Sequence, residues 1–145
     1  VLEPNHPVVA TSYNNLASIY KALGQYDSAL AVQQKAIAIF EQVLEPNHPS
    51  LATSYNNLAG IYQFLGQYDP ALAAQQKAIA IFEQVLEPNH PSLATSYNNL
   101  ALIYRDLGQY DPALAAQQKA VAIREQVLDP DHPNIAQSYN SLASV

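Results

Sequence analysis

The sequence contains no cysteine, methionine or tryptophan, and only six of its 145 residues are Lys or Arg. The absence of cysteine excludes disulfide bonds and thiolate metal sites. The formal net charge is −6. Because phosphate binding needs clustered basic side chains, this composition argues against nucleic acid as a partner.

The sequence also lacks targeting and membrane signals. It has no apolar run approaching the roughly 18 residues of a membrane-spanning helix. Its first residues, Val1 to Pro4, lack the basic and apolar regions of a signal peptide. We therefore expect no membrane association and a cytoplasmic location. The missing initiator Met indicates a piece of a longer protein.

The composition is that of a folded protein, and the sequence consists of an internal repeat. Hydrophobic residues make up 49% of the chain, which predicts a folded domain rather than a disordered tail. The string Val-Leu-Glu-Pro-Asn-His-Pro occurs at 1–7, 43–49 and 85–91, and a close variant at 127–133, so the period is 42 residues. We divide residues 1–145, as one array, into repeats 1–42, 43–84 and 85–126 and a partial repeat, 127–145.

Each repeat carries two helical patterns. In the second repeat, apolar residues with a 3.6-residue period predict helix A at about 49–65 and helix B at about 70–86. Pro49 suits a first helical residue, and Gly66 suits a left-handed C-terminal cap. Asp69 is the predicted N-cap of helix B.

One helix pair cannot bury its apolar faces on both sides, so the pairs are expected to stack into an all-α solenoid. The segment 134–145 matches a helix A without its helix B, and we expect it to cover the last helix pair. The N-terminal side has no such cap, which makes head-to-tail self-association an alternative role for the array.

The repeat has the residue order of a known family. The positions that carry the likeness are Tyr55, Leu58, Ala59, Tyr62, Gly66, Tyr68, Ala71 and Ala78. The repeat resembles the tetratricopeptide repeat. Its 42-residue period and its Ser-Tyr-Asn-Asn-Leu-Ala, Ala-Ile-Arg-Glu and Asp-His-Pro strings are similar to the kinesin light chain subgroup. The resemblance implies a right-handed superhelix whose concave groove, lined by helix A, binds a protein or an extended peptide.

Two departures from the family pattern limit this implication. The family commonly has an aromatic residue in helix B where this chain has Gln33, Gln75 and Gln117, which leaves the packing between helices open. The Lys-and-Asn set that holds a C-terminal carboxylate in chaperone-binding members is absent. We therefore do not expect chaperone tails as ligands.

No residue pattern indicates catalysis, a cofactor or a metal. The histidines His6, His48, His90 and His132 recur once per repeat. Copies on stacked helices lie about 8–10 Å apart, whereas a shared zinc ion needs ligand atoms within about 2.1 Å. Structural histidines in loops are the favoured interpretation, and we expect a protein that is not an enzyme.

Three positions of the repeat differ in every copy. They are Ser18, Gly60 and Leu102; Lys21, Gln63 and Arg105; and Ala22, Phe64 and Asp106. The resemblance places them on the groove face of helix A. Exposed helix-B residues such as Gln76, Lys77 and Gln84 match their copies, so tuning to a ligand is favoured over random drift.

Asparagine pairs supply the second part of the predicted site. An amide both donates and accepts, so Asn14, Asn56 and Asn98 are predicted to contact the main chain of an extended ligand. The second asparagines, Asn15, Asn57 and Asn99, are interpreted as braces between adjacent helices. The predicted groove residues are Asn14, Ser18, Lys21, Asn56, Gly60, Gln63, Phe64, Asn98, Leu102, Arg105 and Asp106.

The charges in this set indicate the ligand. Lys21 and Arg105 flank a possible apolar pocket formed by Phe64 and Leu102, which favours a peptide with an aromatic or aliphatic anchor beside acidic residues. Asp106 offsets Arg105 and can pair with it. Two alternatives stay open: a structural spacer or self-associating array, and a consensus-like engineered scaffold.

Overall fold

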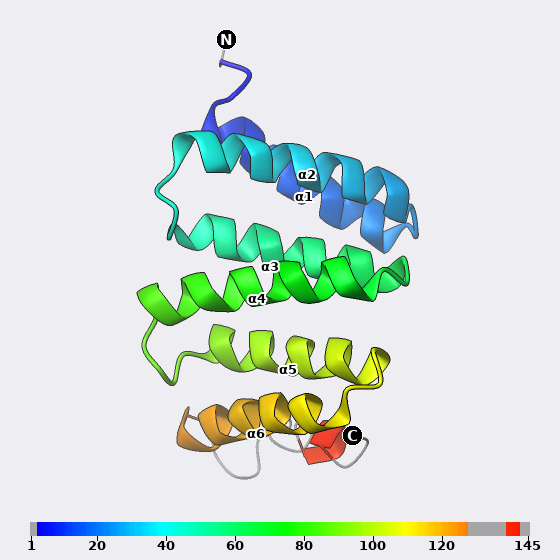
Figure 1. Ribbon diagram of the computed structural model, residues 1–145. Coiled ribbons are helices and arrows are strands. Elements are labelled where there is room, and N and C mark those ends of the chain that lie inside the picture. The colour runs from blue at the N-terminus through cyan, green and yellow to red at the C-terminus, as the bar shows by residue number, and fades with distance from the viewer. Residues whose placement is uncertain (1–2, 128–138, 143–145) are drawn as a thin grey trace.

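The computed structural model describes residues 3–127 and 139–142. Within these ranges the chain forms three antiparallel helix pairs that stack side by side (Figure 1). The helices are α1 (Pro7–Ala22), α2 (Tyr26–Val43), α3 (Pro49–Phe64), α4 (Tyr68–Val85), α5 (Pro91–Asp106) and α6 (Tyr110–Val127). Residues 139–142 are also helical, and these ranges contain no strand. The predicted all-α solenoid is confirmed.

The A helices, α1, α3 and α5, begin where the sequence predicts. Each starts at a proline, which has no N–H to leave unpaired in the first turn. The preceding histidine is the N-cap: His48 Nδ1 accepts a hydrogen bond from the Ser50 N–H at 3.0 Å, and His6 and His90 cap α1 and α5 in the same way. The structural interpretation of the loop histidines is confirmed for these three, whereas His132 lies outside the described residues.

The turns between A and B helices also follow the prediction at Gly66. Its φ of +74° is a left-handed conformation in which a side chain would be strained. This geometry lets α3 end and the chain reverse into α4 within three residues. The predicted left-handed cap is confirmed.

The predicted start of helix B was wrong by two residues. Helix α4 begins at Tyr68, and its N-cap is Gln67, whose side chain makes no capping hydrogen bond. Asp69 therefore lies inside the first turn. There its negative charge interacts favourably with the positive end of the helix dipole, but its side chain does not cap the helix. Pro70 is tolerated at the third helical position because the first-turn N–H groups have no partner within the helix.

The stack is held together by an interior of small and branched side chains. Each helix packs mainly against its neighbours in sequence. Ala52 and Ala59 of α3 are completely buried, and Ile61 of the same helix is only 1% exposed. Alanines at these positions allow close approach of neighbouring helices, so the repeated core fixes how the A helices lie beside one another.

Two findings concern regions beyond the stacked pairs. Of the predicted covering helix 134–145, only 139–142 belong to the described residues. Across the described part of the chain, no helix combines the length and apolarity that crossing a membrane requires.

Candidate ligand groove

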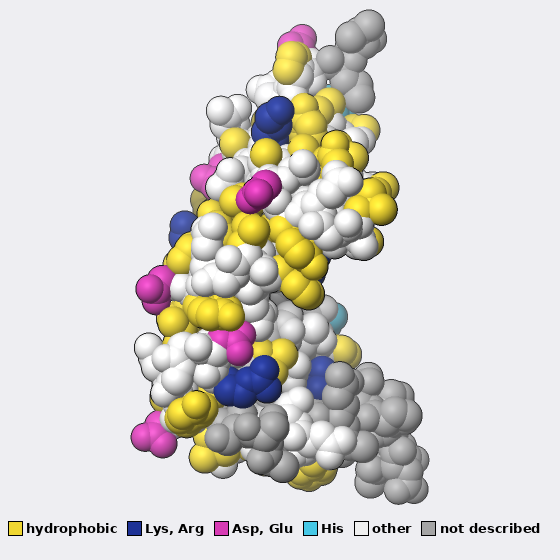
Figure 2. All heavy atoms as spheres, turned by 90° about the vertical axis from the view of Figure 1, so that its right-hand side faces the viewer, with side chains coloured by type: hydrophobic (Ala, Val, Ile, Leu, Met, Phe, Trp, Pro, Cys, Tyr) yellow, Lys and Arg dark blue, Asp and Glu magenta, His cyan; other side chains and the backbone are white. Residues whose placement is uncertain are grey.

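A cleft of about 490 Å³ lies where the A helices of the three repeats come together. Helix α1 contributes one lining residue, whereas α3 and α5 contribute most of the others. The lining residues are Lys21, Asn56, Asn57, Gly60, Gln63, Phe64, Gln75, Asn99, Leu102 and Asp106. Figure 2 shows the stack as a bowed body with an inward bend part-way along one edge and hydrophobic side chains beside it.

One wall of the cleft combines an aromatic ring with an amine. The Phe64 side chain is 61% exposed, and its ring stacks on that of Tyr26 with centroids 5.0 Å apart. The Lys21 Nζ lies 5.1 Å from the Phe64 ring centroid, which is a cation–π contact. This wall therefore offers an apolar surface and a positive charge side by side.

Lys21 is poorly solvated for a charged group. Burial lowers the pKa of its ammonium below the ordinary value. Within residues 3–127 and 139–142 it forms no ion pair. A carboxylate brought into the cleft would supply the missing partner and stabilise the charged form.

The space beside Lys21 exists because residue 60 is glycine. A Cβ at Gly60 would lie 3.0 Å from Lys21 Nζ and 3.9 Å from its Cε. The corresponding residues in the other repeats are Ser18 and Leu102. The middle repeat thus has no side chain at a position where the other two repeats carry one.

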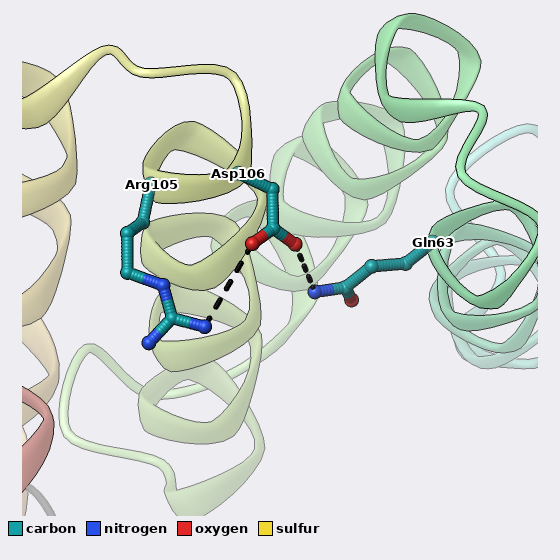
Figure 3. A network of polar contacts seen from close by, with 3 residues as sticks. All are labelled: Gln63, Arg105 and Asp106. Atoms are coloured by element: carbon teal, nitrogen blue, oxygen red, sulfur yellow. Dashed lines mark hydrogen bonds and ion pairs between the residues drawn. The ribbon is translucent and has the colours of Figure 1, made fainter.

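A polar network that joins α3 to α5 also borders the cleft (Figure 3). Gln63 Nε2 donates to Asp106 Oδ2 at 3.0 Å. Arg105 and Asp106 form an ion pair, with Nη2 and Oδ1 3.7 Å apart. The offset of Arg105 by Asp106 is therefore present, and since Arg105 does not line the cleft, Lys21 is its one cationic lining residue.

In the first two repeats, the first asparagine of the pair is held by other side chains. Asn14 Oδ1 accepts from Gln33 Nε2 at 2.5 Å, and Asn14 Nδ2 donates to Ser54 Oγ at 3.0 Å. In the next repeat Asn56 Oδ1 accepts from Gln75 Nε2 at 2.7 Å. Asn56 Oδ1 also accepts from Ser96 Oγ at 3.5 Å. These bonds link an A helix both to its own B helix and to the following A helix.

The same bonds explain the departure from the family pattern in helix B. Gln33, Gln75 and Gln117 are all buried. Gln33 and Gln75 occupy the place of the usual aromatic residue and donate to the asparagine of helix A. An amide–amide pair therefore packs these helices where other members use a ring.

The second asparagine lies closer to the open space. Asn57 and Asn99 line the main cleft, and Asn57 also lines a smaller adjoining pocket of about 200 Å³. Ser18, Lys21 and the buried Gln33 line that smaller pocket too. Gln33 Oε1 has no hydrogen-bond partner within the described part of the chain, so the pocket presents an unused acceptor.

Most predicted groove residues are brought together. Lys21, Asn56, Gly60, Gln63, Phe64, Leu102 and Asp106 line the main cleft, and Ser18 lines the smaller pocket. Asn14, Asn98 and Arg105 line neither. Asn98 Oδ1 is buried and has no partner within residues 3–127 and 139–142.

The sequence prediction missed three lining residues, Asn57, Gln75 and Asn99. The pattern Asn-Asn could have identified two of them, because residue 57 lies three positions before the variable residue 60 and thus on the same helix face. Gln75 carried no such signal, since its copies were noted only as a departure from the family.

The constancy of Gln76 and Lys77, two of the constant helix-B residues, has a structural cause. Gln34 Nε2 donates to the Tyr62 hydroxyl, and Gln76 Nε2 to the Tyr104 hydroxyl, each at 3.2 Å. Lys77 Nζ lies 5.2 Å from the Tyr55 ring centroid. Since these residues join helices, their constancy does not measure drift. The support for variation that follows a ligand comes instead from the cleft that six of the nine variable residues line together.

No known metal-binding arrangement accompanies the groove. In the ranges that the structure describes, His, Cys, Asp and Glu side chains nowhere gather in threes to hold an ion.

Comparisons with known proteins place these observations in a family. The tetratricopeptide repeat model matches residues 8–84, 53–126 and 92–145. No curated protein matches the chain. A kinesin light chain-type protein of Podosopora anserina with nearly identical TPR-like repeats is 32% identical, with a TM-score of 0.88 over 96% of this chain and 66% of its own. BtubC (BKLC) from P. vanneervenii is 25% identical, with a TM-score of 0.90 over 99% of this chain and 57% of its own.

This chain therefore spans less than two thirds of the length of both solved chains. The family model covers well over half of it, and its structural neighbours are kinesin light chain-like. The chain belongs to the tetratricopeptide repeat family.

Proposed function

We propose that the cleft binds an extended segment of a partner protein through one apolar anchor and a neighbouring acidic residue. Tetratricopeptide arrays are generally non-enzymatic scaffolds that bind proteins or peptides. One observation carries the proposal for this chain: the positions that differ in every repeat converge on a single cleft. Six of the nine variable residues line it, namely Lys21, Gly60, Gln63, Phe64, Leu102 and Asp106.

The apolar anchor is proposed to pack between Phe64 and Leu102. Phe64 is largely exposed although it is a large hydrophobic residue. Fully burying an aliphatic or aromatic side chain contributes about 1.5–3 kcal/mol. A ligand side chain seated against this ring would bury both partners.

The acidic residue is proposed to pair with Lys21 and not with Arg105, because Asp106 already neutralises Arg105. Hydrogen bonds to charged groups contribute about 1.5–3 kcal/mol. The partial burial of Lys21 reduces solvent screening of such a pair. A single acidic residue beside the anchor is therefore sufficient for selectivity.

Contacts with the ligand main chain are proposed for Asn57 and Asn99. They line the cleft from successive A helices, so a segment that runs along the array meets both. The amides of Asn14 and Asn56 are used by Gln33, Ser54 and Gln75. The role first assigned to the leading asparagine of each pair is thus better served by the second.

The test is a binding titration with labelled peptides, read by fluorescence anisotropy. The probes are extended peptides with a Leu or Trp anchor beside Glu, with matched peptides carrying Gln or Lys in place of the Glu. The wild-type chain should prefer the Glu peptide about tenfold or more, as expected for one charged pair of about 1.4 kcal/mol.

The matched variants are Lys21→Gln and Lys35→Gln. Lys35 lies over the Tyr13 ring and does not line the cleft, so its loss changes the net charge equally. Lys21→Gln should abolish the preference for Glu, whereas Lys35→Gln should keep it. Equal binding of the acidic, neutral and basic peptides by the wild-type chain would refute the proposed ligand.

A further inference from the structure

The smaller pocket repeats the arrangement of the main cleft one repeat earlier. It lies at the junction of the first and second repeats and is lined by Ala17, Ser18, Lys21, Gln33, Asn57 and Ile61. A shift of 42 residues converts four of these into residues that line the main cleft, namely Gly60, Gln63, Gln75 and Asn99. The two cavities are therefore successive copies of one junction, and a ligand that runs along the array meets both.

The first junction differs from the second in size and in lining. Its pocket has a volume of about 200 Å³, whereas the main cleft has about 490 Å³. Ser18 occupies the place of Gly60, and Lys21 occupies the place of Gln63. None of the described residues that line the smaller pocket is aromatic, whereas Phe64 lines the main cleft. The smaller pocket therefore suits a small polar group better than a second apolar anchor.

One lining residue has an acceptor without a partner. Gln33 is completely buried, and its Nε2 donates to Asn14 Oδ1. The Oε1 atom of the same amide has no hydrogen-bond partner within the described part of the chain. Because an unpaired buried acceptor is unfavourable, a ligand group that donates an N–H to Gln33 is stabilised here.

The other polar side chains of the pocket define the rest of the ligand group. The Lys21 ammonium can only donate, whereas the Asn57 amide donates and accepts. A ligand carboxylate would place acceptor against acceptor at Gln33, and a ligand ammonium would be repelled by Lys21. A primary carboxamide has two N–H donors and one carbonyl acceptor, so it can pair with Gln33, Asn57 and Lys21 together.

We propose that the smaller pocket is a second subsite, which binds a Gln or Asn side chain of the partner segment. This inference rests on the proposed function, in which the same segment places its apolar anchor and its acidic residue in the main cleft. Lys21 lines both cavities. Its ammonium has three donors, so it serves the ligand carboxylate and the carboxamide oxygen at once.

The spacing between the two ligand side chains follows from helix packing. Helix α1 contacts α3, and the axes of packed helices lie about 8–10 Å apart. An extended chain advances about 3.3 Å per residue. The carboxamide residue is therefore expected about three residues from the apolar anchor.

The test extends the anisotropy titration by one peptide position. The Glu peptide with a Leu anchor carries Gln at two, three or four residues from the anchor, on either side, and matched peptides carry Met, Glu or Lys there. Met has a similar length but no amide. At one of these positions Gln should tighten binding about fivefold relative to Met, which corresponds to about 1 kcal/mol. Glu and Lys should bind more weakly than Gln.

Two variants of the chain assign this gain to the smaller pocket. Gln33→Met removes the acceptor and should erase the difference between the Gln and Met peptides. Gln117→Met is the matched control, which should keep the difference, because Gln117 is the buried copy of Gln33 and lines neither cavity. Ser18→Leu fills the pocket without changing the buried amide, and should also erase the difference. Ser18 is exposed, and its copy in the third repeat is Leu102, so this change suits the fold.

The second subsite and the main cleft fail this test in different ways. If the wild-type chain shows no preference for Glu beside the anchor, the proposed function is refuted, and the second subsite with it. If that preference is present but Gln gives no gain over Met at any position, the second subsite alone is refuted. It is equally overturned if either Gln33→Met or Ser18→Leu, shown to be folded by circular dichroism, keeps the gain. Ser18→Leu decides the question if Gln33→Met does not fold.

Discussion

Replacing Asn56 with alanine separates the structural asparagine from the one proposed to bind ligand. Asn56 Oδ1 accepts from Gln75 Nε2 at 2.7 Å, and Gln75 is only 1% exposed. Asn56→Ala would leave that N–H buried without a partner, which costs about 1–3 kcal/mol. For a chain of this size, the melting temperature should fall by about 4–8 °C for 2 kcal/mol.

Asn57→Ala is the matched substitution one residue along the same helix. Asn57 is half-buried and lines the cleft, and surface changes of this kind usually alter stability by about 0.5 kcal/mol or less. It should weaken peptide binding and leave unfolding almost unchanged. Asn56→Ala should instead lower the stability. Its effect on peptide binding should be the smaller of the two, although Asn56 also lines the cleft.

Urea unfolding followed by circular dichroism, together with peptide anisotropy, measures both effects. A double substitution sharpens the assignment: Asn56→Ala/Gln75→Leu removes both polar partners and should recover part of the lost stability. The reasoning is refuted if Asn57→Ala costs as much stability as Asn56→Ala. It is also refuted if Asn56→Ala leaves the free energy of unfolding unchanged.

Further substitutions test the remaining structural interpretations. Gly60→Ala should raise stability by about 0.5–1 kcal/mol because Gly60 lies in a helix, while its new Cβ crowds Lys21 Nζ and lowers peptide affinity. Gly66→Ala should instead cost about 1–2 kcal/mol, since φ is +74° there; equal effects of the two changes in denaturant unfolding would contradict this. His48→Ala should cost about 1 kcal/mol through loss of the helix cap, and His48→Asn should restore most of it; thermal melts that rank the two alike would exclude a capping role. Burial and a hydrogen bond to Glu41 raise the pKa of Tyr55 to about 12 from 10, so its contribution to stability is complete below pH 10 and is lost as the pH rises to 12. Tyr55→Phe should therefore flatten the loss of stability between these pH values, and an unchanged profile would contradict the assignment.

Much of the fold could be predicted from the sequence because the same helix-start and helix-end residues recur in three full repeats, and the helix-start residues recur again in the partial one. Pro49 and Gly66 mark the ends of helix A through backbone properties that only proline and glycine have. Asp69 misled the prediction, since a good capping residue lay two positions inside a helix that begins at Tyr68. The capping propensity of one residue therefore did not determine where the helix begins.

The site was predicted only in part, for reasons that are physical. Gly60, Phe64 and Leu102 were found because each differs from its copies in the other repeats, whereas the scaffold residues match their copies. The exchange of roles between Asn56 and Asn57 could not be derived, because both are amides on adjacent positions and only the partner, the buried Gln75, distinguishes them. The sequence showed that glutamine as an unusual residue but not as the donor to Asn56.

The central claim, that the cleft between the A helices is where a partner binds, is tested most directly by amide NMR spectra during a titration. The ligand is the unlabelled Glu-containing peptide, added to the isotopically labelled chain. We predict that the largest shifts occur at Asn57, Gly60, Phe64 and Leu102, which line the cleft. Shifts confined to the B helices would contradict the account.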